Sequence, residues 1–152
     1  MKNPYSVFSK EFFMMEALKQ ASIAFDHDEI PVGAVVVHDK KIIARAYNQV
    51  ETLNDPTAHA EMLAITAATN YIGNKYLDEC SLYVTLEPCT MCIGATYWAQ
   101  LSEITYGAKD PKKGFLSVAS KATHPKTKVT GGLLAEESLE LLSQFFAKLR
   151  DT

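Results

Sequence analysis

The sequence has few cysteines and no long apolar run. Three cysteines in 152 residues are too few, and an odd number, for a secreted disulfide framework. No apolar stretch approaches the roughly 18 residues that would suggest a membrane-spanning helix. The segment Met1–Tyr5 also lacks the apolar core of a secretory signal. We therefore expect a cytoplasmic protein with no membrane partner.

The rest of the composition is ordinary for a folded protein. Hydrophobic residues make up 47% of the chain and charged residues 22%, which excludes disordered, collagen-like and fibrous classes. A chain of 152 residues has the usual length of one domain, so we expect a single domain over residues 1–152.

Positive charge is scarce overall but concentrated in one segment. The net charge is −3, which by itself argues mildly against a nucleic-acid partner. Residues 109–128 contain six lysines and one aspartate, a local charge of +5. The six are Lys109, Lys112, Lys113, Lys121, Lys126 and Lys128. The segment indicates either an RNA-binding face hidden by the total charge or a plain solvated face.

Hydrophobic periodicity predicts the order helix, strand, strand, helix, strand, helix, strand, helix. Helices are expected over residues 5–25, with Ser9 as N-cap, and over residues 58–70, with Gly73 as stop signal. A third helix is expected over residues 88–100. The last helix is expected around a core-facing stripe of Leu139, Leu142, Phe146 and Leu149. Strands are expected over residues 30–37, 41–47, 81–86 and 103–107, and residues 109–128 as loop with one helical turn. A hairpin followed by alternating helices and strands predicts an α/β fold with a mixed sheet, helices on both faces and parallel late strands.

Two short clusters carry the candidate chemistry. The first is His59-Ala60-Glu61, and the second is Glu87-Pro88-Cys89-Thr90-Met91-Cys92. Each is a weak signal alone, since a single C-x-x-C is also found in zinc ribbons, in redox dithiols and by coincidence. A zinc ribbon needs a second C-x-x-C, which the chain lacks, and a redox dithiol needs a thioredoxin-like pattern, which is also missing.

Together the clusters supply one imidazole and two thiols. Catalytic zinc typically has three protein ligands and an open fourth position. Both clusters begin a predicted helix, whose partial positive charge favours the thiolate form of Cys89 and Cys92. Glu61 need not bind the metal and can exchange a proton with the water that zinc makes acidic. The clusters therefore predict hydrolysis at an electron-poor carbon.

The combination H-A-E … P-C-x-x-C resembles the signature of the zinc-dependent cytidine deaminase superfamily. Further segments are similar to its bacterial tRNA-specific adenosine deaminase branch. They are Pro31–Val35, Asn48, Asp55–Glu61, Tyr83–Cys89, Tyr106–Ala108, His124-Pro125 and Phe145-Phe146. The segment after His124 is shorter than is common in that branch.

This resemblance implies a single cytidine/deoxycytidylate-deaminase-type domain with a three-layer α/β/α fold and about five strands. It implies one zinc ion per subunit on His59, Cys89 and Cys92, with Glu61 as the proton shuttle. Substrate-binding residues would be Asn48, Val32 and Ala60. Further implications are a flipped wobble adenosine of a tRNA anticodon arm as substrate, inosine as product, and a homodimer. The expected RNA contacts are Lys109, Lys112, Lys113, His124, Lys126 and Lys128.

Two rival functions remain open at this point. One is a deaminase of a free nucleobase or nucleoside, such as guanine, cytosine or cytidine, which the acidic net charge fits better. The other is a zinc protein that binds RNA without catalysis, against which Glu61 argues.

Among the other residues, Cys80 is expected to be a buried inert thiol, and Tyr97-Trp98 to lie in the core or at a dimer interface.

Overall fold

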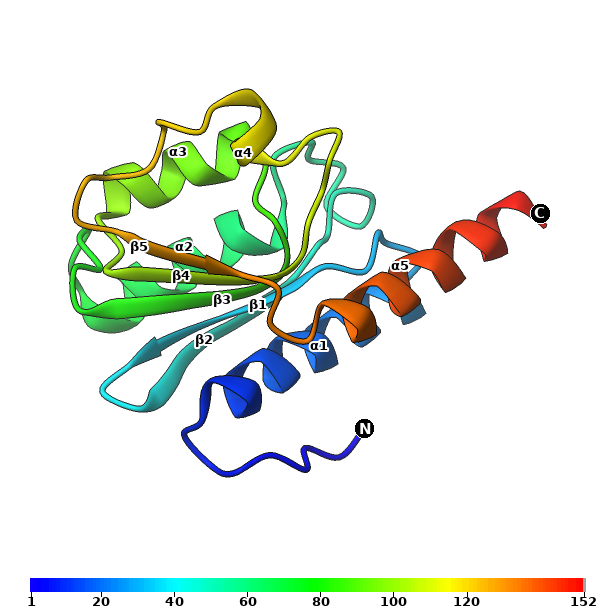
Figure 1. The fold of residues 1–152 in the computed structure, drawn as a ribbon, viewed down its shortest axis with the longest axis horizontal. Helices are drawn as coiled ribbons and strands as arrows, with labels where there is room; N and C mark the ends of the chain where they lie inside the picture. Colours follow the sequence, from blue (N-terminus) through cyan, green and yellow to red (C-terminus); the bar gives the residue numbers. More distant parts are fainter. Residues whose placement is uncertain (152) are drawn as a thin grey trace.

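A five-stranded sheet lies between two layers of helices in the computed structural model, which describes residues 1–151 (Figure 1). The helices are α1 (Lys10–Asp26), α2 (Ala60–Ile72), α3 (Thr90–Ala99), α4 (Phe115–Val118) and α5 (Ala135–Arg150). The strands are β1 (Gly33–His38), β2 (Lys41–Tyr47), β3 (Cys80–Leu86), β4 (Glu103–Ala108) and β5 (Lys128–Gly131). Helices α1 and α5 cover one face, and α2, α3 and α4 lie on the other. The expected three-layer α/β/α fold is confirmed.

The strand order is β2-β1-β3-β4-β5. Strand β1 pairs antiparallel with β2 and with β3, whereas β3, β4 and β5 are parallel. The hairpin and the parallel late pairs are as predicted. As a consequence, β1 begins at the same end of the sheet at which β2, β3 and β4 end. We call this the carboxyl end of β3.

Strand β1 is buried on both faces, which explains its continuous apolar run. Ala34 and Val36 belong to the hydrophobic core on the side of α2 and α3. Val35 and Val37 point to the opposite face and pack with residues of α1 such as Met14. Since successive side chains of a strand alternate between faces, a central strand between two helical layers must be apolar at every position.

The first helix begins later than the sequence predicted. The predicted N-cap is confirmed, because the Ser9 hydroxyl accepts a hydrogen bond from the Phe12 amide at 3.0 Å. The helix therefore starts at Lys10, and the expected helical residues 5–9 lie outside it. Phe8 just before it has a φ of 73°, so the backbone leaves the helical path there. The predicted stop of α2 is confirmed, because Gly73 follows it with a φ of 75°.

Strand β5 was missed: of the residues expected to be loop, Lys128 is its first residue, and no strand was predicted over residues 128–131. It is a four-residue edge strand in which only Val129 is a half-buried apolar side chain. So short a strand with one apolar position leaves no periodic signal. The single helical turn expected in the same region is confirmed as α4.

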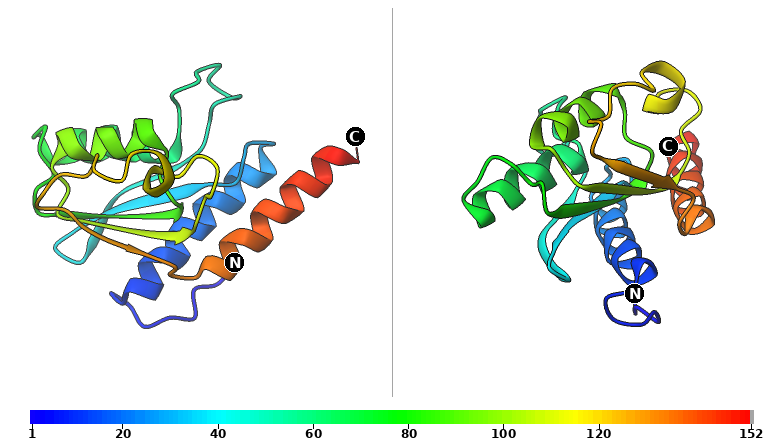
Figure 2. Two further views of the ribbon diagram at one scale, coloured as in Figure 1. Left: turned by 45° about the horizontal axis from the view of Figure 1, so that its top comes forward. Right: turned by 60° about the vertical axis from the view of Figure 1, so that its left-hand side comes forward.

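The buried face of α5 is also not the one predicted. Of the expected stripe, Leu139, Phe146 and Leu149 are exposed, whereas Ser138 and Phe145 are buried. The Ser138 hydroxyl donates to the Thr85 carbonyl at 2.6 Å and thereby sets the rotation of the helix on the sheet. The far part of α5 projects beyond the body of the molecule (Figure 2), where a helix has less to pack against.

Within residues 1–151, the helices are either too short or too polar to cross a lipid bilayer.

Candidate metal centre and substrate site

The two clusters predicted from the sequence meet at the carboxyl end of β3. His59 directly precedes α2, and Cys89 directly precedes α3. Both residues take the N-cap position with extended backbone, and in the described chain neither side chain caps its helix. Their ring nitrogen and sulfur are therefore available for another partner. Cys92 lies in the first turn of α3, so one helix start supplies both thiols.

The three donor atoms lie at the separations that a tetrahedral metal ion requires. His59 Nδ1 is 3.6 Å from Cys89 Sγ and 3.5 Å from Cys92 Sγ. The donor atoms of all three residues lie within 4.8 Å of one another. Tetrahedral bonds of about 2.0 Å to nitrogen and about 2.3 Å to sulfur would separate a nitrogen and a sulfur donor by about 3.5 Å. The residues therefore fit zinc both in chemistry and in spacing.

The two thiols differ strongly in acidity. The Cys92 thiol hydrogen-bonds to Cys89 and, together with His59, lowers the pKa of Cys89 to about 4, although burial opposes this. The same contact, burial and the charge of Glu61 raise the pKa of Cys92. The hydrogen bond with Cys89 raises the pKa of His59, against burial and the positive charge of Lys113. The lowered pKa of Cys89 favours its thiolate form, which a zinc ligand requires.

Glu61 is a buried carboxyl group beside the sulfur ligands. It lies in the first turn of α2, is only 4% exposed, and is within hydrogen-bonding reach of Cys92. Burial raises the pKa of Glu61 to about 7, and the charge of Cys89 acts in the same direction. A group with a pKa near neutrality can both accept and release a proton at working pH.

Asn48 offers an unused hydrogen-bond acceptor at the same end of the sheet. Its amide nitrogen donates to the Ile30 carbonyl at 3.2 Å, while its Oδ1 is buried without a partner among residues 1–151. An unsatisfied buried acceptor is costly, so its persistence suggests a missing ligand. The Gln49 amide bonds to the Ala58 carbonyl at 3.0 Å, which draws Asn48 toward His59.

Val32 and Ala60, the other two residues expected to contact the substrate, lie next to Asn48 and His59. Val32 immediately precedes β1 and is 8% exposed. Its carbonyl accepts a hydrogen bond from the backbone amide of Asn48 at 3.0 Å. Ala60 is fully buried as the first residue of α2, between His59 and Glu61. The structure therefore brings together all the residues that the sequence analysis assigned to metal and substrate.

The expected RNA contacts are divided between the two ends of the sheet. Lys109, Lys112 and Lys113 follow β4 at the carboxyl end of β3. Lys128 pairs with Glu103, where β4 begins, so it lies at the opposite end, and Lys126 is two residues away. The His124 ring lies 5.1 Å from the Tyr97 ring, beside the far end of α3. These five lysines therefore lie in two groups, and one group is remote from the candidate metal centre.

Two buried carboxylates next to the site were not singled out from the sequence. Glu29 is 1% exposed and Glu87 is 3% exposed, and each accepts hydrogen bonds from the backbone of a neighbouring loop. The only signal for Glu87 was its place two residues before Cys89, inside the second cluster. A charged residue gives no hydropathy signal that would reveal its burial.

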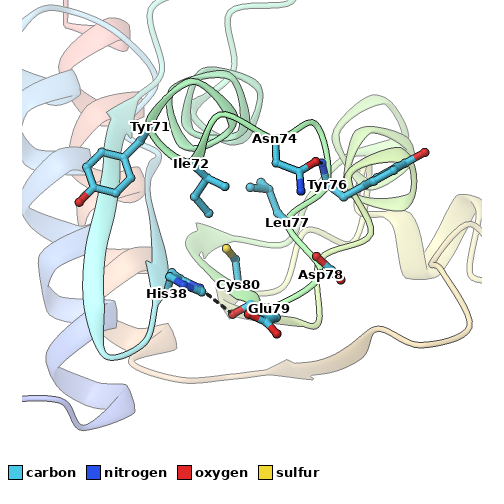
Figure 3. A pocket seen from close by; sticks show the side chains of 9 residues that line it. All are labelled: His38, Tyr71, Ile72, Asn74, Tyr76, Leu77, Asp78, Glu79 and Cys80. Atoms are coloured by element: carbon cyan, nitrogen blue, oxygen red, sulfur yellow. Dashed lines mark hydrogen bonds between the residues drawn. The ribbon is translucent and has the colours of Figure 1, made fainter.

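A second feature is a pocket of about 430 Å³, whose lining side chains include His38, Tyr71 and Cys80 (Figure 3). It is found where β1 ends at His38 and β3 begins at Cys80, the end of the sheet opposite to the metal ligands. Cys80 is 1% exposed, so its expected burial is confirmed, and burial raises the pKa of its thiol to about 11, in line with a weakly reactive group. Among the described residues that line this pocket, none was assigned to metal, substrate or RNA.

Comparisons with known proteins agree with this geometry. The sequence model of the MafB19-like deaminase family matches residues 8–150. A tRNA-specific adenosine deaminase of Aquifex aeolicus is 44% identical over 146 residues, covering 93% of this chain and 97% of that protein.

Solved structures give the same picture. A structure from a study of A-to-I editing by tRNA:A34 deaminases at the wobble position of transfer RNA superposes with a TM-score of 0.80. It is 43% identical, and the match covers 85% of this chain and 97% of the other. A guanine deaminase from Bacillus subtilis superposes with a TM-score of 0.64 at 40% identity, covering 76% and 71%.

Proposed function

This chain belongs to the MafB19-like deaminase family, and we propose that it converts adenosine to inosine at the wobble position of a tRNA. The supporting observation is the buried Glu61 carboxyl beside three metal-ligating side chains. The relatives named tRNA-specific adenosine deaminase match nearly the whole chain, which favours this substrate over a free base.

His59, Cys89 and Cys92 would hold one zinc ion per subunit. Zinc bound there would supply an acidified water molecule as nucleophile near neutral pH. The mixture of one imidazole and two thiols, with donor separations of 3.5 and 3.6 Å, supports zinc over hard ions that prefer oxygen ligands.

Glu61 would carry the protons of the reaction. Hydrolytic deamination adds a water oxygen to the purine carbon that bears the amine, and the carbon–nitrogen bond then breaks to release ammonia. The Glu61 carboxylate accepts one proton from the water and delivers it to the adjacent ring nitrogen. It then takes the second proton from the hydroxyl group on the attacked carbon and delivers it to the departing amine. Its buried position keeps bulk water away from this exchange.

The nucleoside would be held by residues on the β1 and β2 side of the site. The free Oδ1 of Asn48 would accept a hydrogen bond from the substrate. Val32 would line the face of the base, and the backbone at Ala60 would contact its edge. Reaching this site requires the adenosine to leave the anticodon stack, as is general for enzymes that act on bases.

The tRNA anticodon arm would contact the basic segment in two places. Lys109, Lys112 and Lys113 lie near the metal centre and would bind phosphates close to the flipped adenosine. His124, Lys126 and Lys128 lie at the other end of the sheet and would contact phosphates farther along the backbone. Such contacts release counterions, so binding would weaken steeply as salt rises.

The chain would act as a homodimer through the exposed face of α2 and α3. Trp98 is 77% exposed, and Tyr97 is 38% exposed on the same helix. A groove of about 500 Å³ is lined by Ile65, Lys75, Tyr76, Ala95, Trp98 and Ala99. Large exposed aromatic side chains around a mostly apolar groove are typical of a protein interface.

A cytoplasmic location is part of this proposal, because Cys89 and Cys92 must stay reduced to bind zinc.

The test compares RNA with free bases. The zinc-loaded protein is incubated with an anticodon stem-loop that has adenosine at the wobble position, and with the same stem-loop carrying the adenosine one position away. Free guanine, cytosine, adenosine and cytidine are assayed in parallel. We expect inosine only at the wobble position, no ammonia from the free compounds, and loss of activity after chelation that zinc restores. Ammonia from guanine with unchanged RNA would instead favour a free-base deaminase.

A further inference from the structure

Glu87 is a buried carboxylate that binds two backbone amides of another segment. It follows β3 and precedes Cys89 by two residues. Its Oε1 accepts a hydrogen bond from the Asp110 amide at 3.1 Å, and its Oε2 accepts one from the Leu116 amide at 2.9 Å. Because the side chain is 3% exposed, water contributes little to its solvation. Both carboxylate oxygens are thus used to hold residues 110 and 116.

The loop of residues 109–116 also rests directly on the segment that carries Cys89. The Phe115 amide donates to the Pro88 carbonyl at 2.9 Å, and Gly114 forms an isolated antiparallel bridge with Cys89. A side chain at Gly114 would place its Cβ 2.3 Å from Glu87 Oε2 and 2.5 Å from the Asp110 carbonyl. The loop is therefore packed so closely on Glu87 that only glycine fits at this point.

This loop carries Lys109, Lys112 and Lys113, and the positive charge of Lys113 acts on His59. The Asp110 carboxylate accepts hydrogen bonds from the Lys112 and Lys113 amides, both at 3.1 Å. Glu87 binds the Asp110 amide, so a chain of hydrogen bonds runs from the metal-ligand segment to the backbone of both lysines. The position of the two ammonium groups relative to Cys89 depends on that chain.

We propose that Glu87 is a positioning residue that couples the lysine-bearing loop to the metal centre. It contacts neither substrate nor metal but acts through the loop of residues 109–116. This inference rests on the proposed function, because it assigns Lys112 and Lys113 to the phosphates of a bound RNA. The RNA is then held at a fixed distance from the reacting base.

The carboxylate is required because both loop amides are donors. A glutamine in its place has one acceptor oxygen, and its NH₂ group would face the second amide donor. Hydrogen bonds to an ionised acceptor are also stronger than those to a neutral one. Glu87→Gln should therefore loosen the loop while changing the volume of the side chain very little.

The experiment measures loop order and RNA kinetics in the zinc-loaded protein. In Glu87→Gln, we expect the Asp110 and Leu116 amides to lose protection from hydrogen exchange. We expect KM for the anticodon stem-loop to rise about tenfold, as for one lost charged hydrogen bond, with kcat and zinc content nearly unchanged. Glu16→Gln is the matched control, since Glu16 is a buried carboxylate in α1 that contacts Asn3, Lys19 and Arg45. It should leave KM unchanged.

A second variant displaces the loop without altering Glu87. Gly114→Ala should push the loop away and raise KM in the same way. If the loop amides lose protection from hydrogen exchange in either variant but KM stays unchanged, the proposal is overturned. A loss of zinc, or a fall in kcat at constant KM, would overturn it as well. If the wild-type protein deaminates no stem-loop, the proposed function fails instead. Hydrogen exchange and stem-loop binding would still show whether Glu87 positions the lysines.

Discussion

At the scale of single residues, Glu61 is the side chain on which the proposed chemistry depends most. Glu61→Gln keeps the three metal ligands but removes the group that exchanges protons. We expect zinc content to stay at one ion per subunit and inosine formation to fall by roughly 100- to 10,000-fold, the usual contribution of a general acid–base group. Metal analysis and inosine quantification on the stem-loop check this. Normal turnover by the variant would assign proton transfer to another group.

Residue types and spacing were enough to predict that the donor atoms of His59, Cys89 and Cys92 lie together. The sequence could combine His59 with Cys89 and Cys92 because each type is a soft ligand and each cluster begins a helix. The sequence could not reveal that Oδ1 of Asn48 is buried without a hydrogen-bond partner. Whether a polar atom finds a partner depends on the groups that surround it in the folded structure. The same limit hid Glu87, whose partners lie 23 and 29 residues away.

At the scale of elements, the connection between β2 and α2 is organised by one carboxylate. Glu29 Oε1 accepts the Glu51 amide at 3.0 Å, and Oε2 accepts the amide and hydroxyl of Thr52, both at 2.6 Å. Burial raises the pKa of Glu29, but the hydrogen bonds from Thr52 and Glu51 outweigh it and hold the pKa below 4.5. Because this connection joins Asn48 to His59, Glu29 supports both sides of the site.

Glu29→Gln should therefore lower stability in a pH-dependent way. The free energy of unfolding is expected to fall by roughly 1–3 kcal/mol at neutral pH, the cost of leaving buried donors unsatisfied. Since the folded-state pKa is depressed, the carboxylate contributes fully above pH 4.5 and loses its contribution as the pH falls further. The difference between wild type and variant should shrink in that range.

Urea unfolding of both proteins over this pH range measures the effect. Asp39→Asn, which changes an exposed carboxylate in the β1–β2 turn, is the control and should not alter stability. A constant difference between wild type and Glu29→Gln at all pH values would mean that the ionised carboxylate is not the stabilising form.

The elements that sequence predicted well are those with a strong periodic or capping signal. Strand β2 was predicted with its observed bounds, and the ends of α2 and α3 within two residues. Strand β5 was missed because pairing with β4, and not its own composition, makes it a strand. The prediction of which face of α5 is buried was wrong. The hydrogen bond from Ser138 to Thr85 and the packing of Phe145 on Phe25 determine that face.

At the scale of the whole molecule, the division of the lysines predicts how RNA binding responds to salt. Replacing Lys112 and Lys113 by alanine should weaken stem-loop binding and reduce the slope of log Kd against log salt by about 0.7–0.9 per lost phosphate contact. Replacing Lys126 and Lys128 should reduce it less, since they lie at the far end of the sheet. Titrations of Kd at several salt concentrations measure both slopes.

The control for this prediction is a pair of lysines of the β1–β2 hairpin. Lys40 and Lys41 lie at the turn, opposite to the metal centre, and their replacement by alanine should leave the slope unchanged. A larger change for Lys40 and Lys41 than for Lys112 and Lys113 would place the RNA on another face.

Self-association gives a second prediction at this scale. Trp98→Glu puts a charge in the centre of the exposed α2–α3 face and should convert the proposed dimer to a monomer. Leu139→Glu is the matched control, because Leu139 is 51% exposed on α5, in the opposite layer. Sedimentation of the three proteins distinguishes them. A Trp98→Glu protein that remains dimeric would exclude this face as the interface.

The change from antiparallel to parallel pairing at β3 has a consequence for how such a protein can evolve. Asn48 and Val32 come from the antiparallel half of the sheet, while the two sulfur ligands and the lysine loop follow strands of the parallel half. Substitutions next to β1 and β2 can reshape the proposed base pocket without moving the two sulfurs, and the side chains of Lys112 and Lys113 can change without altering that pocket. New substrate preferences can therefore arise on one half while Cys89 and Cys92, which follow the other half, are inherited unchanged.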